Sequence, residues 1–205
     1  MLRLVRHGYG TGGRRLATPP HGARLLFLHR SHLIAACFAR SVVAQTADDF
    51  AKMLEGSEWK RLFDTYGIGT VVLPAVDRFS GMLCPLPTSL IASPEWALVY
   101  ADDAALVFTK NISANRQVIE AHRLSVDDFF EHVLKLTEYY QPRWQNGKYF
   151  YSTRGIALAN LKRWGEAIDC LRIASAMDPT DDVTAAALQQ VIRRADAQAR
   201  DHRAK

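Results

Sequence analysis

The residue with the clearest chemical potential in this sequence is His7, which stands between Arg6 and Gly8. An imidazole can accept a phosphoryl group when cationic donors hold the phosphate beside it and an acid protonates the leaving group. Such chemistry also needs a second histidine that another strand positions. The later histidines fall in or beside predicted helices; they are His122, His132 and His202. His7 is therefore a candidate phosphoryl acceptor for which the sequence offers no second histidine after an apolar strand.

Arg6-His7-Gly8 resembles the opening of a histidine phosphatase, in which a strand presents the reactive histidine. Arg40 with Gln45-Thr46-Ala47 is similar to a second feature of that family. The resemblance implies a phosphoryl-transfer enzyme that uses His7. The chain between His7 and Arg40 is too rich in proline for the helix expected there. This function is therefore the alternative hypothesis.

Other polar residues do not assemble into a recognisable centre. Asp102-Asp103 could act as paired carboxylates, but adjacent aspartates between two apolar runs are typical of a solvated turn. The glycines before residue 14 lack the lysine and hydroxyl residue of a phosphate-binding loop. His29 and His32 have no third ligand nearby, and three widely spaced cysteines offer no metal-ligand pattern; they are Cys37, Cys84 and Cys170. The sequence predicts no catalytic set, no cofactor and no metal.

The composition narrows the classes of partner and location. The chain has 205 residues, of which 48% are hydrophobic, and a formal net charge of +5. Its basic residues are divided between the first thirty positions and the last helix without a recognised motif, so no nucleic acid partner is predicted. The longest apolar run, residues 25–39, is interrupted by His29, Arg30 and His32. We expect a protein that is soluble as encoded, with no signal peptide and no transmembrane segment.

A small α/β domain is predicted over residues 24–112, after an irregular N-terminal arm over residues 1–23 that is rich in glycine, arginine and proline. Arg24 opens a short apolar strand, and Thr70–Leu73 forms a second one. Two apolar runs on either side of Asp102-Asp103 predict a β-hairpin. These strands predict a short mixed sheet.

Helices are predicted between these strands. One begins near Thr46, and another begins at Ser57 and ends at Gly67 in a left-handed turn. Prolines at Pro85 and two residues later limit the following stretch to a short helix around residues 89–92. The region therefore alternates helices and strands.

The remainder, residues 124–203, is predicted to be helical throughout. Ser125 caps its first helix, and Pro142 ends that helix. Three further helices are expected over residues 149–161, 165–177 and 182–200. The predicted fold class is α+β, with a small α/β domain and a short mixed sheet followed by an all-α helical hairpin with flanking helices.

The two central helices carry a repeat pattern. Its residues are Tyr151, Gly155, Leu158, Ala167, Leu171, Ala174 and Pro179. This pattern resembles a tetratricopeptide repeat (TPR). Gly155 and Ala167 are small where the helices are expected to approach closely, and Leu158 and Leu171 fill the space between them. The resemblance implies a non-catalytic module that binds another protein or peptide.

Aromatic residues are concentrated where the two regions join. They are Tyr139, Tyr140, Trp144, Tyr149, Phe150 and Tyr151. Two interpretations are open, namely packing between helices, or a peptide-binding groove whose exposed aromatic residues anchor a partner. For the groove, the candidate partner-binding residues are Tyr140, Trp144, Tyr149 and Arg154.

The first region carries a second resemblance, over residues 12–110. Its most specific residues are Pro94, Trp96, Leu98-Val99-Tyr100, Asp102-Asp103 and Val107-Phe108. They resemble the water-exposed C-terminal region of bacterial multi-spanning membrane proteins of the glycosyltransferase type. This implies an accessory domain detached from a catalytic membrane portion, a membrane-associated, extracytoplasmic context, and a membrane protein among the partners. The leading hypothesis is a non-catalytic accessory protein with a TPR-like module.

Overall fold

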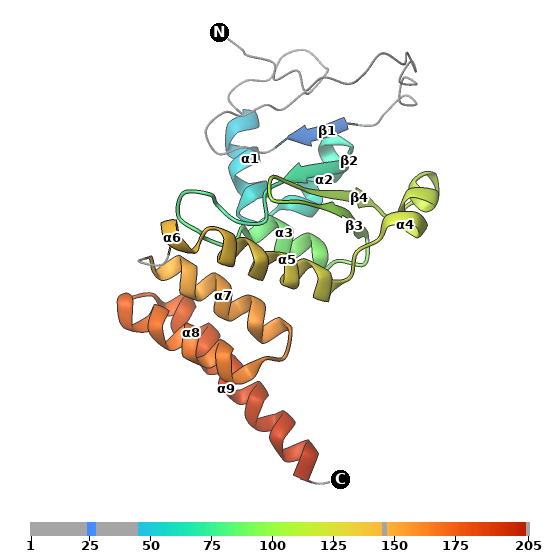
Figure 1. Ribbon diagram of the computed structural model, residues 1–205. Helices are drawn as coiled ribbons and strands as arrows, with labels where there is room; N and C mark the ends of the chain where they lie inside the picture. The colour runs from blue at the N-terminus through green and yellow to red at the C-terminus, as the bar shows by residue number, and fades with distance from the viewer. Residues whose placement is uncertain (1–23, 28–44, 145–146, 204–205) are drawn as a thin grey trace.

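The computed structural model describes residues 24–27, 45–144 and 147–203 (Figure 1). The predicted irregular arm, residues 1–23, lies outside these ranges. In the described chain a small sheet with its helices is followed by a layered group of helices, and the last helix extends away from that group (Figure 1).

The fold class is α+β, as predicted. The strands are β1 (Arg24–Phe27), β2 (Ile68–Leu73), β3 (Trp96–Ala101) and β4 (Leu106–Lys110). The helices of the first region are α1 (Gln45–Leu54), α2 (Trp59–Tyr66), α3 (Pro85–Ile91), the 3-10 turn η1 (Ser113–Asn115) and α4 (Arg116–His122). Those of the second region are α5 (Val126–Tyr139), α6 (Gln141–Trp144), α7 (Lys148–Asn160), α8 (Trp164–Met177) and α9 (Asp182–Arg203).

The four strands form one mixed sheet in the order β1-β2-β4-β3. β1 runs parallel to β2, whereas β4 is antiparallel to both β2 and β3. Phe108 of β4 lies between Val71 of β2 and Leu98 of β3, and all three side chains are buried. The predicted mixed sheet and the predicted hairpin are both confirmed.

Local sequence determines where two helices end or begin. Gly67 has a φ of 60° and ends α2 as predicted, because glycine adopts the left-handed conformation without steric cost. Ser125 starts α5 through a reciprocal pair of hydrogen bonds with Asp128. The Asp128 amide donates to Ser125 Oγ at 3.0 Å, and the Ser125 amide donates to Asp128 Oδ2 at 2.7 Å.

The prediction that prolines delay α3 until about residue 89 is wrong. This helix begins at Pro85. In the first turn of a helix the backbone N–H groups have no acceptor within the helix, so proline loses no hydrogen bond there and its fixed φ suits the helix. Likewise, α5 already ends at Tyr139, and Pro142 lies inside α6. Helix α4 was not predicted.

α7 and α8 form the predicted antiparallel hairpin, and the flanking helices cover it on both sides (Figure 1). α5 packs against α7, whereas α9 packs against α8. These two helices bury surfaces that an isolated helical hairpin would leave open. Within the described ranges, every helix is too short or too polar to cross a membrane.

One hydrophobic core is continuous across the boundary predicted between residues 112 and 124. Under the sheet, Trp59, Phe63 and Trp96 pack edge to face with ring centroids 5.3 to 6.5 Å apart. The same core continues through Val133 of α5 to Leu171 of α8. The sheet and the helical hairpin therefore share buried contacts.

Candidate functional site

The repeat-like residues meet inside the α7–α8 hairpin. Leu158, Ala167, Leu171 and Ala174 are buried, Tyr151 is half-buried, and Pro179 follows α8 at the surface. A Cβ atom added to Gly155 would lie 2.7 Å from Leu171 Cγ, which is closer than real contacts allow. The expected close approach of the two helices at Gly155 is confirmed. Membership of the TPR family stays a prediction.

Trp144 of α6 joins the helical region to the loop that follows β2. Its Nε1 donates to the carbonyl oxygen of Arg78 at 3.0 Å, and its ring stacks on Tyr140 with centroids 4.6 Å apart. Gly81 of the same loop packs against this ring, since a Cβ atom there would lie 2.9 Å from Trp144 Cδ2. With 2% of its surface exposed, Trp144 packs between elements and is not an exposed anchor for a partner.

The other three predicted partner-binding residues are half-buried. Tyr140 is covered on one face by Trp144. The Arg154 guanidinium donates to Thr137 Oγ1 at 3.2 Å and lies 3.5 Å from a Glu138 carboxylate oxygen, so it ties α7 to α5. The packing interpretation therefore describes Trp144 and Arg154, while Tyr149 stays partly accessible at the start of α7.

Lys148 closes the open end of the helical hairpin. Its Nζ lies 2.6 Å from Asp178 Oδ2 and 3.1 Å from Asp181 Oδ2, so one ammonium joins the start of α7 to the loop between α8 and α9. Hydrogen bonds to Asp178 and Asp181 raise the pKa of Lys148, and the bond from Lys148 lowers the pKa of Asp178 to about 2. All three groups are charged at neutral pH.

The most exposed large apolar side chains lie on or beside elements that begin or end at this side of the helical region. Phe79, Tyr139 and Val183 are the three most exposed large hydrophobic residues of the described chain, at 71%, 70% and 79%, and Met177 is also exposed. Phe79 lies one residue from Arg78, whose carbonyl binds Trp144, and Tyr139 packs on Tyr140. Met177 and Val183 flank the loop that Lys148 holds. We call these four residues, Phe79, Tyr139, Met177 and Val183, the α6 edge.

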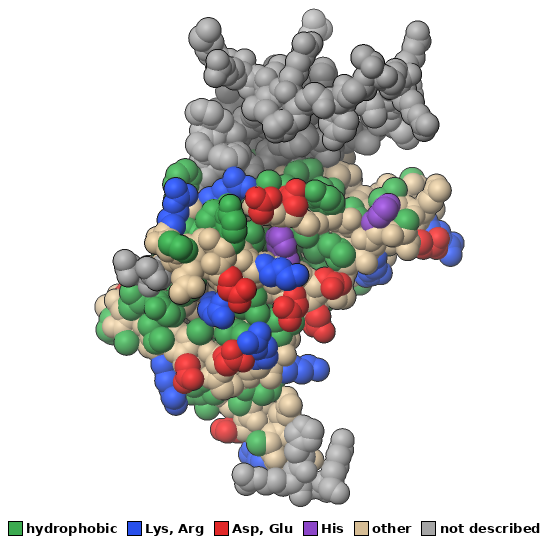
Figure 2. Space-filling view, viewed as in Figure 1, with side chains coloured by type: hydrophobic (Ala, Val, Ile, Leu, Met, Phe, Trp, Pro, Cys, Tyr) green, Lys and Arg blue, Asp and Glu red, His purple; other side chains and the backbone are tan. Residues whose placement is uncertain are grey.

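Figure 1 shows where the elements that carry or adjoin these residues lie. α5 ends, α7 begins, α8 ends and α9 begins at the same side of the molecule, with α6 and the loop after β2 beside them. Figure 2 shows hydrophobic side chains over this side, whereas Lys, Arg, Asp and Glu alternate over the central face along α5. Of the α6 edge, sequence reasoning grouped only Tyr139 with the aromatic cluster. An aromatic residue in the otherwise polar stretch Asp77–Ser80 was the available signal for Phe79.

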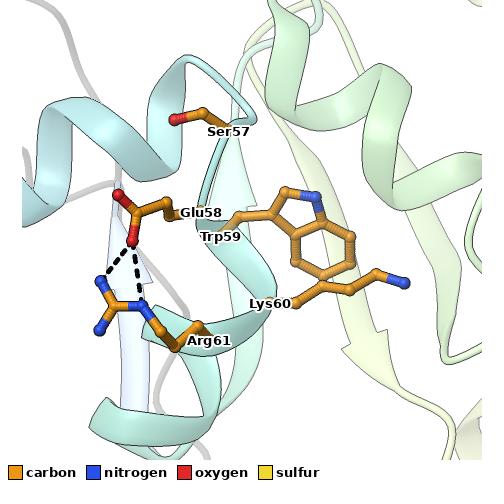
Figure 3. Close-up of a pocket in the computed structure, with 5 residues that line it drawn as sticks. All are labelled: Ser57, Glu58, Trp59, Lys60 and Arg61. Atoms are coloured by element: carbon orange, nitrogen blue, oxygen red, sulfur yellow. Dashed lines mark hydrogen bonds and ion pairs between the residues drawn. The ribbon is translucent and has the colours of Figure 1, made fainter.

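A hollow of about 430 Å³ lies at the start of α2 (Figure 3). Glu58 and Arg61 pair with each other on one side of the helix, with Arg61 Nε 3.0 Å from Glu58 Oε2. Trp59 and Lys60 point to the other side (Figure 3). The polar groups do not converge on a common point, so this hollow lacks the arrangement that a small-molecule site requires.

The turn of the β-hairpin faces His132 of α5. Asp102 Oδ1 accepts hydrogen bonds from the amides of Ala104 and Ala105, both at 2.8 Å, which confirms its predicted role in a turn. Burial opposes ionisation of Asp102, but hydrogen bonds from Tyr100 and these two amides outweigh it and lower its pKa. Asp102 is therefore a turn residue whose hydrogen bonds favour its ionised form, and it is not held as a proton donor.

His132 is half-buried against this turn, and its Nε2 has no hydrogen-bond partner among the described residues. Burial lowers the pKa of His132, although a hydrogen bond to the backbone of Asp102 and the nearby carboxylates of Asp102 and Asp103 oppose the effect. Lys135, on the same helix, disfavours the imidazolium further. The folded protein thus favours neutral His132.

A pH dependence of stability follows from His132. The folded-state pKa of His132 is below the unfolded value of about 6.5. Neutral His132 therefore contributes to stability fully above about pH 6.5, and this contribution is lost as the pH falls through the folded-state pKa. We expect His132→Phe, which cannot titrate, to become more stable relative to the parent protein between pH 7.5 and pH 5. Urea unfolding of both proteins across this range checks the expectation, and a pH-independent difference would contradict it.

Arg6, His7 and Arg40 of the phosphatase hypothesis lie outside the described ranges, whereas Gln45, Thr46 and Ala47 begin α1. The metal candidates His29 and His32 also lie outside these ranges. Within the described ranges, no three histidine, cysteine or carboxylate side chains are close enough to hold a metal ion. Cys84 and Cys170 are both half-buried, and burial raises the pKa of the Cys170 thiol.

Comparisons with known proteins found no match. No protein-family model, no curated protein and no solved structure matches this chain.

Proposed function

We propose that this protein is a non-catalytic accessory protein that binds another protein or a peptide through its helical region, with the α6 edge as the contact surface. The observation that carries the proposal is the high exposure of Phe79, Tyr139 and Val183, which belong to or adjoin elements that begin or end on one side of the molecule. Three large apolar side chains that remain about three-quarters exposed contribute little to folding, whereas covering them would favour association. Single exposed apolar residues need no explanation, but a group on one side does.

The TPR-like pattern supports the same class of function. Helical hairpins of this kind expose extended surfaces to protein partners, and the α6 edge includes both ends of the α8–α9 connection. The resemblance of residues 12–110 to the exposed region of membrane glycosyltransferase-like proteins favours a membrane protein as the partner. It also favours a membrane-associated, extracytoplasmic setting. A repeat-like fold supports the general inference that the protein binds a partner, and it does not identify that partner.

The decisive experiment compares two sets of surface substitutions. The edge variant carries Phe79→Ser, Tyr139→Ser, Met177→Ser and Val183→Ser, and the matched control carries Ile112→Ser, Val118→Ser and Val126→Ser at exposed positions elsewhere. Each is immobilised and exposed to lysate and membrane fractions of the native organism. We expect the edge variant to lose the partner that the parent and the control retain. Equal recovery on all three proteins would overturn the proposal, provided that circular dichroism shows all three folded.

A further inference from the structure

His132 of α5 is a half-buried titratable side chain outside the surface proposed for binding. Its Nε2 atom is buried and has no hydrogen-bond partner among the described residues. In the neutral ring this nitrogen is at most an unused acceptor. In the imidazolium both ring nitrogens carry a proton, so Nε2 becomes a buried donor without an acceptor, which costs more because the ring is also charged. The position of the ring in the structure therefore suits the neutral form.

The turn that His132 faces, residues 102–105, is closed by its own hydrogen bonds. Asp102 Oδ1 accepts from the amides of Ala104 and Ala105, and the Tyr100 hydroxyl donates to Asp102 Oδ2 at 2.7 Å. The Asp102 amide also donates to the Ala105 carbonyl at 3.0 Å. Both carboxylate oxygens of Asp102 thus bind groups in or beside the turn. None of these bonds involves the imidazole, so the turn can keep its shape when the ring moves.

The charged groups around His132 come from three segments of the chain. Asp102 and Asp103 of the turn favour the imidazolium, whereas Lys135 of α5 disfavours it. Arg78, in the loop after β2, donates from Nη2 to the Asp103 carbonyl at 3.0 Å, so a second cation lies close to the turn. The Asp103 side chain is exposed and takes no part in the hydrogen bonds of the turn. Its carboxylate is therefore open to an imidazolium.

Burial and charge act on His132 in opposite directions. Burial is the largest influence on its pKa and lowers it, so the two carboxylates do not compensate for the hydration that the charged ring loses in this position. Because the ring is only half-buried, a change of χ1 rotamer can bring it to solvent without opening the core. In solvent the imidazolium is hydrated and the carboxylates still attract it. The neutral ring and the charged ring thus favour different positions.

We propose that the contact between His132 and the turn of residues 102–105 is an acid-operated switch. At neutral pH the neutral ring lies against the turn. When the ring takes up a proton, it rotates outward and pairs with the Asp103 carboxylate, while the turn keeps its own hydrogen bonds. Arg78, which binds the turn, precedes Phe79 of the α6 edge, so the switch lies beside the surface proposed for binding but does not depend on that function.

The movement of the ring can be measured by NMR on the full chain. The titration of the His132 ring protons should have a midpoint below about 6.5, the ordinary value for histidine. Nuclear Overhauser contacts between the ring and residues 102–105 should be present above this midpoint and lost below it. Contacts that persist in the protonated protein would overturn the proposal. A ring that stays neutral until acid unfolds the protein would overturn it as well.

Substitution of the surrounding charges tests the pairing. Asp103→Asn removes the carboxylate that receives the imidazolium, so it should lower the midpoint of the His132 titration. Lys135→Gln removes the cation that opposes protonation and should raise it. The control Asp196→Asn removes an exposed carboxylate from α9 and should leave the midpoint unchanged. An Asp103→Asn protein with the midpoint of the parent would refute the pairing and with it the proposal.

His132→Gln separates the switch from the general effects of acid. Glutamine is polar but does not titrate, so the amide resonances of Ala104 and Ala105 should lose the transition that accompanies the titration of His132. They should keep any transition that accompanies protonation of the carboxylates. If both amides follow the same pH curve in His132→Gln and in the parent, the switch is refuted. No partner enters these measurements, so their outcome does not decide the proposed binding function.

Discussion

Replacing Trp144 by alanine is expected to lower the free energy of unfolding by about 3 to 5 kcal/mol. The substitution removes a ring that is 2% exposed, that stacks on Tyr140 and that covers Gly81. It also leaves the Arg78 carbonyl without its hydrogen bond at the junction of the two regions. Urea unfolding followed by far-UV circular dichroism measures the loss.

Two further substitutions separate the causes. Trp144→Phe retains an aromatic ring but not the Nε1 donor, so its effect beyond packing should be about 1 kcal/mol. Tyr139→Ala removes an exposed ring five residues away and should change stability by no more than about 0.5 kcal/mol. A loss below about 1 kcal/mol for Trp144→Ala would mean that the junction does not support the fold.

The same unfolding curves test the predicted division at residues 112–124. Because one core runs from the sheet through α5 into the helical hairpin, we expect a single cooperative transition. Trp144→Ala should shift that transition as a whole. A variant that instead unfolds in two steps would show that residues 24–112 and 124–203 are separate folding units.

Several parts of the fold that the sequence predicted have a local cause. Gly67 ends α2 because of its own backbone freedom, and Ser125 starts α5 through a residue three positions later. Asp102 forms a turn through amides two and three positions away. Each signal and its structural result lie within one turn of chain, so no tertiary contact was needed to infer them.

The contacts at the candidate site have non-local causes. Trp144 finds its acceptor 66 residues earlier in the chain, and nothing local distinguishes a buried tryptophan from an exposed one. Arg154 occupies a position where the repeat pattern has leucine, and its partner Thr137 comes from a helix outside that pattern. The loop that contains Phe79 is likewise held by hydrogen bonds to Trp144 of α6 and Thr153 of α7. These features required the assembled structure.

Pro85 shows a different kind of failure. Proline was taken as an interruption, whereas its effect depends on position within the helix, because only residues after the first turn need their N–H. The sequence alone did not show where that first turn lies. Leu86 and Leu90 lie on one face of α3 and are buried, and α3 packs against β3. This packing favours a helix that begins at Pro85.

Gly155→Ala is expected to reverse the sign of its effect when Leu171 is shortened. In the parent protein the new Cβ atom would lie 2.7 Å from Leu171 Cγ and 3.2 Å from the Ala167 carbonyl oxygen. Overpacking of this kind costs about 1 to 3 kcal/mol, which outweighs the gain of about 1 kcal/mol from replacing a helical glycine. Gly155→Ala alone should therefore destabilise the protein.

In a Leu171→Ala background the closest obstacle is absent. That substitution alone should cost about 2 to 5 kcal/mol, because Leu171 is fully buried between α7 and α8. Adding Gly155→Ala should then be neutral or stabilising by up to about 1 kcal/mol. A double-mutant cycle from urea unfolding measures the coupling between the two sites.

The matched control is Gly165→Ala on α8, where an added Cβ atom would meet nothing within 4 Å. It should leave stability unchanged or raise it slightly in either background, since only helix propensity is altered. If Gly155→Ala and Leu171→Ala instead prove additive, the two helices do not touch through these atoms. Close packing at Gly155 would then no longer explain why the hairpin has glycine there, and the physical basis of the repeat-like pattern would have to be sought in the turns.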